Sequence, residues 1–270
     1  MNTAETLVIE LRGARVAAMR DPSRVVLEDV NWPVRSGEFW VVAGPPHSGK
    51  SDLLLHAAGL MSPLQGTCRV LGCEAAELDE THLDVRRRVG FVFADGRLFH
   101  QFTIFENVAL PLRYHQNLPP AEAAQTVARL LELLELTPYA SQRPGQVPAA
   151  WRQRAALARA LVLKPELLVL DNPSGSLMAR HRFWLVDFLD QLGRGHAFLD
   201  GRPLTLVVST DDPRLWQHPR RQFAAIHEGT FTALGTWNSP EFDRHPAMRE
   251  LLAAPPETKR ADAKTETPNE

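Results

Sequence analysis

The sequence has no long hydrophobic run and very few cysteines. No apolar stretch approaches the roughly 18 residues that a membrane-spanning helix needs, and the N-terminus lacks a basic segment followed by a long apolar one. We therefore expect a cytoplasmic protein whose association with a membrane goes through a partner. The two cysteines, Cys68 and Cys73, have no second ligand pair at zinc-site spacing, so we interpret them as small apolar residues in a reducing compartment.

A large charge of one sign is also missing. The 30 basic and 32 acidic residues are spread along the chain and give a formal net charge of -2. No basic stripe is visible, which argues against nucleic acid as a partner. Of the 270 residues, 44% are hydrophobic, which is typical of a soluble protein that buries a core.

Short apolar runs are present, and they indicate the strands of a buried sheet. Each is bounded by turn residues, as in parallel strands that are covered on both faces; the runs are residues 39–44, 167–171 and 204–209. The first run leads through a loop into a segment with helical spacing of leucines. Amphipathic segments at 119–136 and 151–163 predict further helices. The apolar stripe of the first segment consists of Ala124, Val127, Leu130, Leu131 and Leu134. We therefore expect an α/β protein with a mostly parallel sheet and a helical subdomain inserted at about residues 96–162.

The loop after the first run carries a phosphate-binding pattern. "GPPHSGKS" fits G-x-x-x-x-G-K-[ST] and lies between a predicted strand and a predicted helix. The glycines permit close backbone approach, and the helix N-terminus offers free amides to phosphate oxygens. We expect Lys50 to reach the terminal phosphates and the Ser51 hydroxyl to hold Mg²⁺. The predicted nucleotide-binding residues are Gly44, Pro45, His47, Ser48, Gly49, Lys50, Ser51 and Asp52.

Two residues of this loop argue against tight binding. Pro46 has no backbone N–H to offer. Asp52 would place a carboxylate beside the phosphates, where it suits the helix dipole in the empty site but repels a bound nucleotide. We therefore expect ATP to bind weakly.

The order of the motifs resembles that of the ATP-binding subunit of ABC transporters. The phosphate loop, the helical region, "RQRAALARAL" and "LLVLD" follow one another at the family's spacing, and the resemblance covers about residues 7–235. It implies a P-loop NTPase core with an N-terminal antiparallel β region, ATP and Mg²⁺ as ligands, and Asp171 as the residue that assists the Mg²⁺. The phrase "FENVALPLRYHQNLP" is most similar to Mla/Mce-type lipid-transport ATPases, which implies a lipid cargo.

The resemblance also implies partners and a location. The partners are a transmembrane permease subunit and a second ATP-binding subunit, either another copy of this chain or a paralogue. The location is peripheral, on the inner face of the cell membrane. We expect one ATP-binding domain over residues 1–240, a helical extension over 241–254 and a disordered tail over 255–270.

The positions that hydrolyse ATP in this family carry other residues in this chain. Asn172 stands at the position of the Glu general base, Thr210 at that of the His after the next strand, and Ala94 at that of the Mg²⁺-sensing Gln. The signature Leu-Ser-Gly-Gly-Gln is replaced by "VPAAW" at 147–151, and Met178 replaces an Asp. Losing a general base typically costs about 10² to 10⁴ in rate. The sequence therefore favours a degenerate ATPase.

Two functions stay open at this point. The first is a transporter subunit that binds nucleotide with slow or absent hydrolysis. The second is a structural or regulatory pseudo-ATPase that holds a permease or a partner ATPase without using nucleotide; Pro46, Asp52 and "VPAAW" favour it. The adenine-stacking aromatic of the family is absent as well, and Met19 is the nearest large apolar residue. A P-loop kinase is a weaker alternative, because no acceptor-site base or basic lid is visible.

Overall fold

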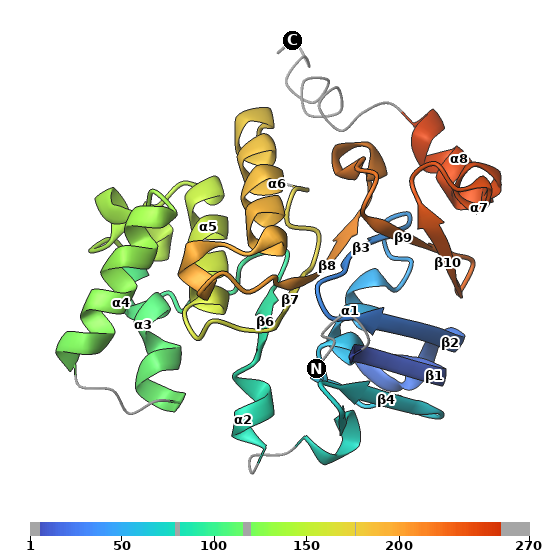
Figure 1. Cartoon of the computed structure of the whole chain (residues 1–270), viewed down its shortest axis with the longest axis horizontal. Coiled ribbons are helices and arrows are strands. Elements are labelled where there is room, and N and C mark those ends of the chain that lie inside the picture. Colours follow the sequence, from blue (N-terminus) through green and yellow to red (C-terminus); the bar gives the residue numbers. More distant parts are fainter. Residues whose placement is uncertain (1–5, 79–81, 116–119, 176, 255–270) are drawn as a thin grey trace, which may run out of the picture.

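The computed structural model describes residues 6–78, 82–115, 120–175 and 177–254. The predicted tail at 255–270 lies outside the described residues. One sheet runs through the molecule, with helices on both of its faces (Figure 1). None of the described helices combines the length and the apolar character that crossing a bilayer requires.

The sheet has ten described strands in the order β5-β4-β1-β2-β10-β9-β3-β8-β7-β6. Their bounds are β1 (Leu7–Ala18), β2 (Asp21–Arg35), β3 (Phe39–Ala43), β4 (Thr67–Val70), β5 (Cys73–Glu74), β6 (Val89–Val92), β7 (Leu167–Leu170), β8 (Thr205–Thr210), β9 (Gln222–His227) and β10 (Thr230–Thr236). Strands β9, β3, β8, β7 and β6 are parallel neighbours, whereas β1 pairs antiparallel with both β2 and β4. The predicted α/β fold with a mostly parallel core and an N-terminal antiparallel region is confirmed.

The helices fall into groups along the chain. Their bounds are α1 (Lys50–Ala57), α2 (Leu83–Arg86), α3 (Ile104–His115), α4 (Pro120–Leu133), α5 (Ala149–Leu161), α6 (Ala179–Arg194), α7 (Pro240–Arg244) and α8 (Pro246–Ala253). Helices α3, α4 and α5 lie together at one side of the molecule, between β6 and β7 in the chain, and α7 and α8 lie beside β9 and β10 (Figure 1).

The central strands are hydrophobic without interruption because both of their faces are covered. All residues of β3, β7 and β8 are buried. Successive side chains of a strand point to opposite faces, so Leu168 and Leu170 pack in the cluster under α3 to α6, whereas Leu167 and Val169 pack in the cluster that includes α1 and β1. This double burial explains why the runs lack the alternation of a half-exposed strand.

The carboxyl ends of three adjacent strands meet at one edge of the sheet. Ala43, the last residue of β3, lies opposite Thr210, the last residue of β8, and Leu170 at the end of β7 lies opposite Val208. The loops that follow these strands must therefore begin side by side. In open parallel sheets this edge is where ligands bind.

Candidate phosphate-binding site

The loop from β3 into α1 has the tight conformation that a phosphate cradle needs. Gly44 has no room for a side chain, since a Cβ would lie 2.7 Å from Ser48 Oγ and 2.9 Å from Ile226 O. Gly49 precedes α1 with a φ of 96°, a conformation that glycine adopts readily. Both glycines of the motif are thus required by the backbone, and the N-terminus of α1 lies where the motif predicts it.

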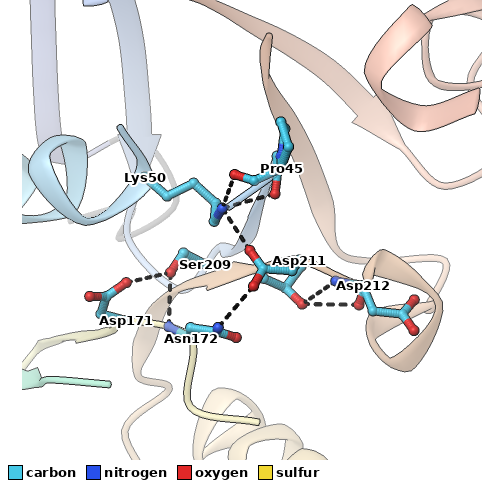
Figure 2. A network of polar contacts seen from close by, with 9 residues as sticks. Pro45, Lys50, Asp171, Asn172, Ser209, Asp211 and Asp212 are labelled. Carbon is cyan, nitrogen blue, oxygen red and sulfur yellow. Dashed lines mark hydrogen bonds and ion pairs between the residues drawn. The ribbon is translucent and has the colours of Figure 1, made fainter. Parts of the chain in front are cut away.

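Lys50 is buried, and its ammonium group is held by the protein itself. The Nζ atom donates to Gly44 O at 2.8 Å and to Pro45 O at 2.7 Å, and it pairs with Asp211 Oδ1 at 2.7 Å (Figure 2). An ammonium group has three donors, so these three acceptors use all of them. The side chain of Lys50 is 7% exposed and that of Asp211 is 25% exposed, so solvent screens this ion pair only in part.

Asp171 and Asn172 follow β7 and join the same network through Ser209. The Ser209 hydroxyl donates to Asp171 Oδ1 at 2.8 Å and accepts from the Asn172 backbone N–H at 2.9 Å. The Asn172 amide donates from Nδ2 to Asp211 Oδ2 at 3.2 Å (Figure 2). Each oxygen of the Asp211 carboxylate therefore has a partner, one on the phosphate loop and one after β7.

The side chain of Asp52 is directed to the turn between β1 and β2. Its Oδ1 accepts a hydrogen bond from the Met19 backbone N–H at 2.7 Å. Met19 is 41% exposed and is the large apolar residue where the family resemblance implies an adenine-stacking aromatic. Asp52 therefore ties α1 to the Met19 turn, and this contact gives its carboxylate a structural partner that the sequence did not predict. Ser51 beside it is exposed.

Three of the altered catalytic positions lie at or just after the carboxyl ends of β6, β7 and β8, and none offers a general base. Thr210 is buried, and its Oγ1 donates to Asp212 O at 3.0 Å and accepts from Asp212 N at 3.1 Å. Ala94 lies exposed in the turn after β6 and has no polar atom in its side chain. Asn172 has an amide at the base position, which cannot accept a proton from water.

The segment at 147–151 contains the start of α5 and is buried only in part, since Pro148 and Ala149 are exposed. Val147 is buried, and Pro148 occupies the N-cap position without a side-chain cap. The ring of Trp151 lies 5.2 Å from that of Tyr139, centroid to centroid, and the Arg154 guanidinium lies 4.4 Å from the Trp151 ring centroid. Methyl groups, a proline and an indole thus stand where amides and a hydroxyl would be needed to contact a phosphate. Met178, at the start of α6, is 73% exposed.

The residues present fit a nucleotide with Mg²⁺ in part. The phosphate loop, the Ser51 hydroxyl and the Asp171 carboxylate are oxygen and amide groups of the kind that phosphates and Mg²⁺ prefer, and they lie at one edge of the sheet. Among the described residues no preformed group of three or more acidic, His or Cys side chains could hold a metal alone. Such an ion would therefore depend on phosphate oxygens.

Asp211 and Ser209 are site residues that the sequence analysis missed. Both belong to the run "VVSTDD", which contains the end of β8, the strand next to β3, and the two residues after it. The signal was available, because a hydroxyl and carboxylates at the end of a parallel strand beside a phosphate loop are placed at its edge. Of this run, only Thr210 was among the predicted site residues.

Burial shifts the titration of two groups near α1. His56 is fully buried, its Nδ1 lies 2.8 Å from Asp52 O, and burial lowers its pKa below the usual 6.5. Cys68 is buried on β4, and burial raises the pKa of its thiol to about 12. Neither cysteine forms a disulfide, and Cys73 is half-buried.

Comparison with known protein families and sequences gives one consistent result. The model of the family described as "ABC transporter" matches residues 27–175. The sulfate/thiosulfate import ATP-binding protein CysA of Synechocystis sp. is 36% identical over 222 residues, which cover 82% of this chain and 59% of the relative. The CysA of Methylococcus capsulatus is 37% identical over 225 residues, covering 82% and 61%. The chain thus spans about 60% of the length of these curated relatives, and their names do not support the lipid-transport assignment.

Solved structures agree with this result. The dimeric post-hydrolysis state of the ATP-binding cassette MJ0796 bound to ADP and Pi is similar, with a TM-score of 0.73 and 27% identity, and the match covers 84% of this chain and 98% of that one. A dimeric structure of MJ0796, a bacterial ABC transporter cassette, has a TM-score of 0.72 and 28% identity, covering 82% and 95%.

Proposed function

From the premise that this chain belongs to the ABC transporter family, we propose that it is an ATP-binding transporter subunit in which nucleotide binding, with slow or absent hydrolysis, is coupled to transport. The supporting observation is the meeting of the phosphate loop, Asp171 and Lys50 at the carboxyl ends of β3, β8 and β7. The proposed cofactors are ATP and Mg²⁺.

In this proposal one set of groups binds the phosphates and another binds the metal ion. The backbone amides at the start of α1 and the ammonium group of Lys50 hold the phosphates, and the Ser51 hydroxyl and the Asp171 carboxylate hold Mg²⁺. The metal ion, when bound, neutralises charge on the phosphate oxygens. Ser209 orients Asp171 through its 2.8 Å hydrogen bond.

The proposal of weak hydrolysis rests on residues of this chain and not on its relatives, whose names describe ATP-binding proteins. Asn172 can hold a water molecule but cannot take its proton, which alone costs about 10² to 10⁴ in rate. Ala94 and Thr210 supply no replacement base. Starting from a typical enzyme turnover of about 10 per second, these losses predict about 0.1 per second or less.

We propose a membrane permease and a second ATP-binding subunit, which is another copy of this chain or a paralogue, as the partners, and a peripheral location at the inner face of the membrane. The names of the relatives make sulfate and thiosulfate, rather than lipid, the first cargo to test. Purification of the full chain from native membranes, followed by identification of the bound integral membrane protein, tests this part of the proposal.

The alternative is a pseudo-ATPase that holds a permease or partner ATPase without nucleotide. One observation favours it: the Lys50 ammonium already has three acceptors within the chain. The two functions differ in one measurement, because a transporter subunit must bind Mg-ATP at millimolar concentration and a purely structural one need not.

Calorimetric titration of Mg-ATP, together with phosphate release by the same preparation, tests the proposed function. We expect weak binding that is lost in Lys50→Ala. Lys164→Ala is the matched control, because the Lys164 ammonium group also pairs with an aspartate, Asp200, at 2.8 Å. Lys164 lies between α5 and the start of β7, at the end of the sheet opposite to the phosphate loop. Turnover above about 1 per second that Lys50→Ala abolishes would contradict the claim of weak hydrolysis.

A further inference from the structure

Asp211 has no role in the function proposed above, yet its carboxylate forms an ion pair with the lysine of the phosphate loop. Its Oδ1 lies 2.7 Å from Lys50 Nζ, the group that the motif assigns to terminal phosphates. A carboxylate has the negative charge and the oxygen acceptors of a phosphate group. Asp211 thus offers Lys50 the kind of partner that a nucleotide would offer.

We propose that Asp211 is a built-in competitor of the nucleotide's terminal phosphates, which must leave Lys50 before Mg-ATP can bind fully. This inference rests on the proposed function, since it concerns the same site. It adds a form of regulation: the affinity of the chain for nucleotide is set by how often Lys50 is free of Asp211.

The geometry identifies Asp211 as the acceptor that a phosphate can replace. The other two acceptors of Lys50 are the carbonyl groups of Gly44 and Pro45, which belong to the phosphate loop itself. These carbonyls stay beside the Lys50 ammonium group for as long as the loop and the lysine side chain keep their conformation. Asp211 comes from the segment after β8, a different strand, so it can move away while the loop keeps its shape.

Asn172 holds the competitor in place. Its amide donates to Asp211 Oδ2 at 3.2 Å, so the two carboxylate oxygens are fixed from two directions (Figure 2). An amide can donate this hydrogen bond, whereas an ionised Glu at the same position has only acceptors and carries a like charge. The Asn172 amide therefore fixes the Asp211 carboxylate in the position where it pairs with Lys50.

Movement of Asp211 would be passed to the C-terminal helices. The next residue, Asp212, caps the short helix η6 (Pro213–Trp216) and forms an ion pair with Arg214 at 2.7 Å. Arg214 Nη1 in turn donates to Ala254 O, just after α8, at 2.9 Å. The segment 211–216 is thus tied at one end to the phosphate site and at the other to the end of α8.

The test compares Mg-ATP affinities of full-length variants by calorimetry. If Lys50 is free of Asp211 in a tenth of the molecules or fewer, the competitor weakens binding at least about tenfold. We therefore expect Asp211→Asn and Asp211→Ala to bind Mg-ATP about tenfold or more tightly than the wild type. Asp200→Asn, which removes the carboxylate of the exposed Lys164 pair, is the matched control and should leave the affinity unchanged.

A second readout uses only the wild-type chain. Hydrogen exchange of the amides at 211–216 should change when Mg-ATP is added, because the segment loses its contact with Lys50. Equal affinity of wild type and both Asp211 variants, or unchanged exchange at 211–216 with nucleotide bound, would overturn the inference and leave the proposed function standing. Absence of Mg-ATP binding in the wild type and in all variants would overturn both.

Discussion

Replacing Asn172 by glutamate introduces the residue that serves as general base in the ABC transporter family. We expect this variant to be less stable than the wild type and to hydrolyse ATP no faster than about 1 per second. The Asn172 amide lies 3.2 Å from Asp211 Oδ2, so a carboxylate at this position would face a carboxylate. Two unit charges about 4 Å apart at an effective dielectric constant of about 20 repel by about 4 kcal/mol. Loss of the hydrogen bond to a charged acceptor adds about 1.5 to 3 kcal/mol.

The longer glutamate side chain can bend away, and Asp211 is 25% exposed, so the net effect is smaller than this sum. We expect Asn172→Glu to lower the free energy of unfolding by about 3 kcal/mol at pH 8, which corresponds to a drop of about 6 to 12 °C in the unfolding midpoint. At pH 5 the deficit should shrink, because protonation of one of the two carboxyl groups removes the repulsion.

The assays are urea unfolding at pH 5 and pH 8 and phosphate release with Mg-ATP. Asn172→Gln is the matched control, since it has the length of glutamate and keeps an amide that can donate to Asp211. The double variant Asn172→Glu/Asp211→Ala should recover most of the lost stability. An Asn172→Glu chain as stable as the wild type at pH 8, with turnover above about 1 per second, would refute the reasoning.

The remaining predictions concern the core and the buried titratable groups. His56→Leu should remove one cause of acid destabilisation. Burial lowers the pKa of His56 in the folded chain, so below about pH 6.5 the imidazole takes up a proton more readily in the unfolded chain than in the folded one. The folded state therefore loses stability as the pH falls from about 6.5 to the folded-state pKa. Urea unfolding from pH 8 to pH 5 should therefore show a shallower loss for the variant, and an equal slope would contradict the assignment. Cys68 should resist iodoacetamide at pH 8 in the folded chain while Cys73 reacts, as mass spectrometry of digested protein would show, because burial raises the pKa of the Cys68 thiol to about 12. Leu170→Ala, in the fully buried β7, should cost about 2 to 5 kcal/mol of unfolding free energy in the same urea assay, and a cost below 1 kcal/mol would mean that the site collapses around the smaller side chain.

Local patterns in the sequence predicted the strands and helices whose buried residues recur at a regular spacing. The apolar runs of β3, β7 and β8 are strands, and Val127, Leu130 and Leu131 of the predicted stripe on α4 are buried. Ala123 is buried in place of the predicted Ala124. A helical period of 3.6 residues does not decide between two neighbouring alanines at the end of a stripe.

Contacts between distant segments were beyond these patterns. The Lys50–Asp211 pair and the Asp52–Met19 hydrogen bond join residues far apart in the chain, and they depend on the order of the strands in the sheet. The lipid assignment came from one short phrase at 105–119, part of which lies outside the described residues, and the names of the relatives do not support it. Short motifs predicted the family better than the cargo, because the phosphate loop and the motifs that follow it concern the nucleotide.

The central claim, that this chain binds nucleotide but hydrolyses it poorly, is tested most directly on the complex isolated from its own membrane. Mg-ATP binding and phosphate release should be measured on the same sample, with the Lys50→Ala complex as the reference. We expect Lys50-dependent binding with phosphate release at about 0.1 per second or less. Lys50-dependent release at about 1 per second or faster would contradict it.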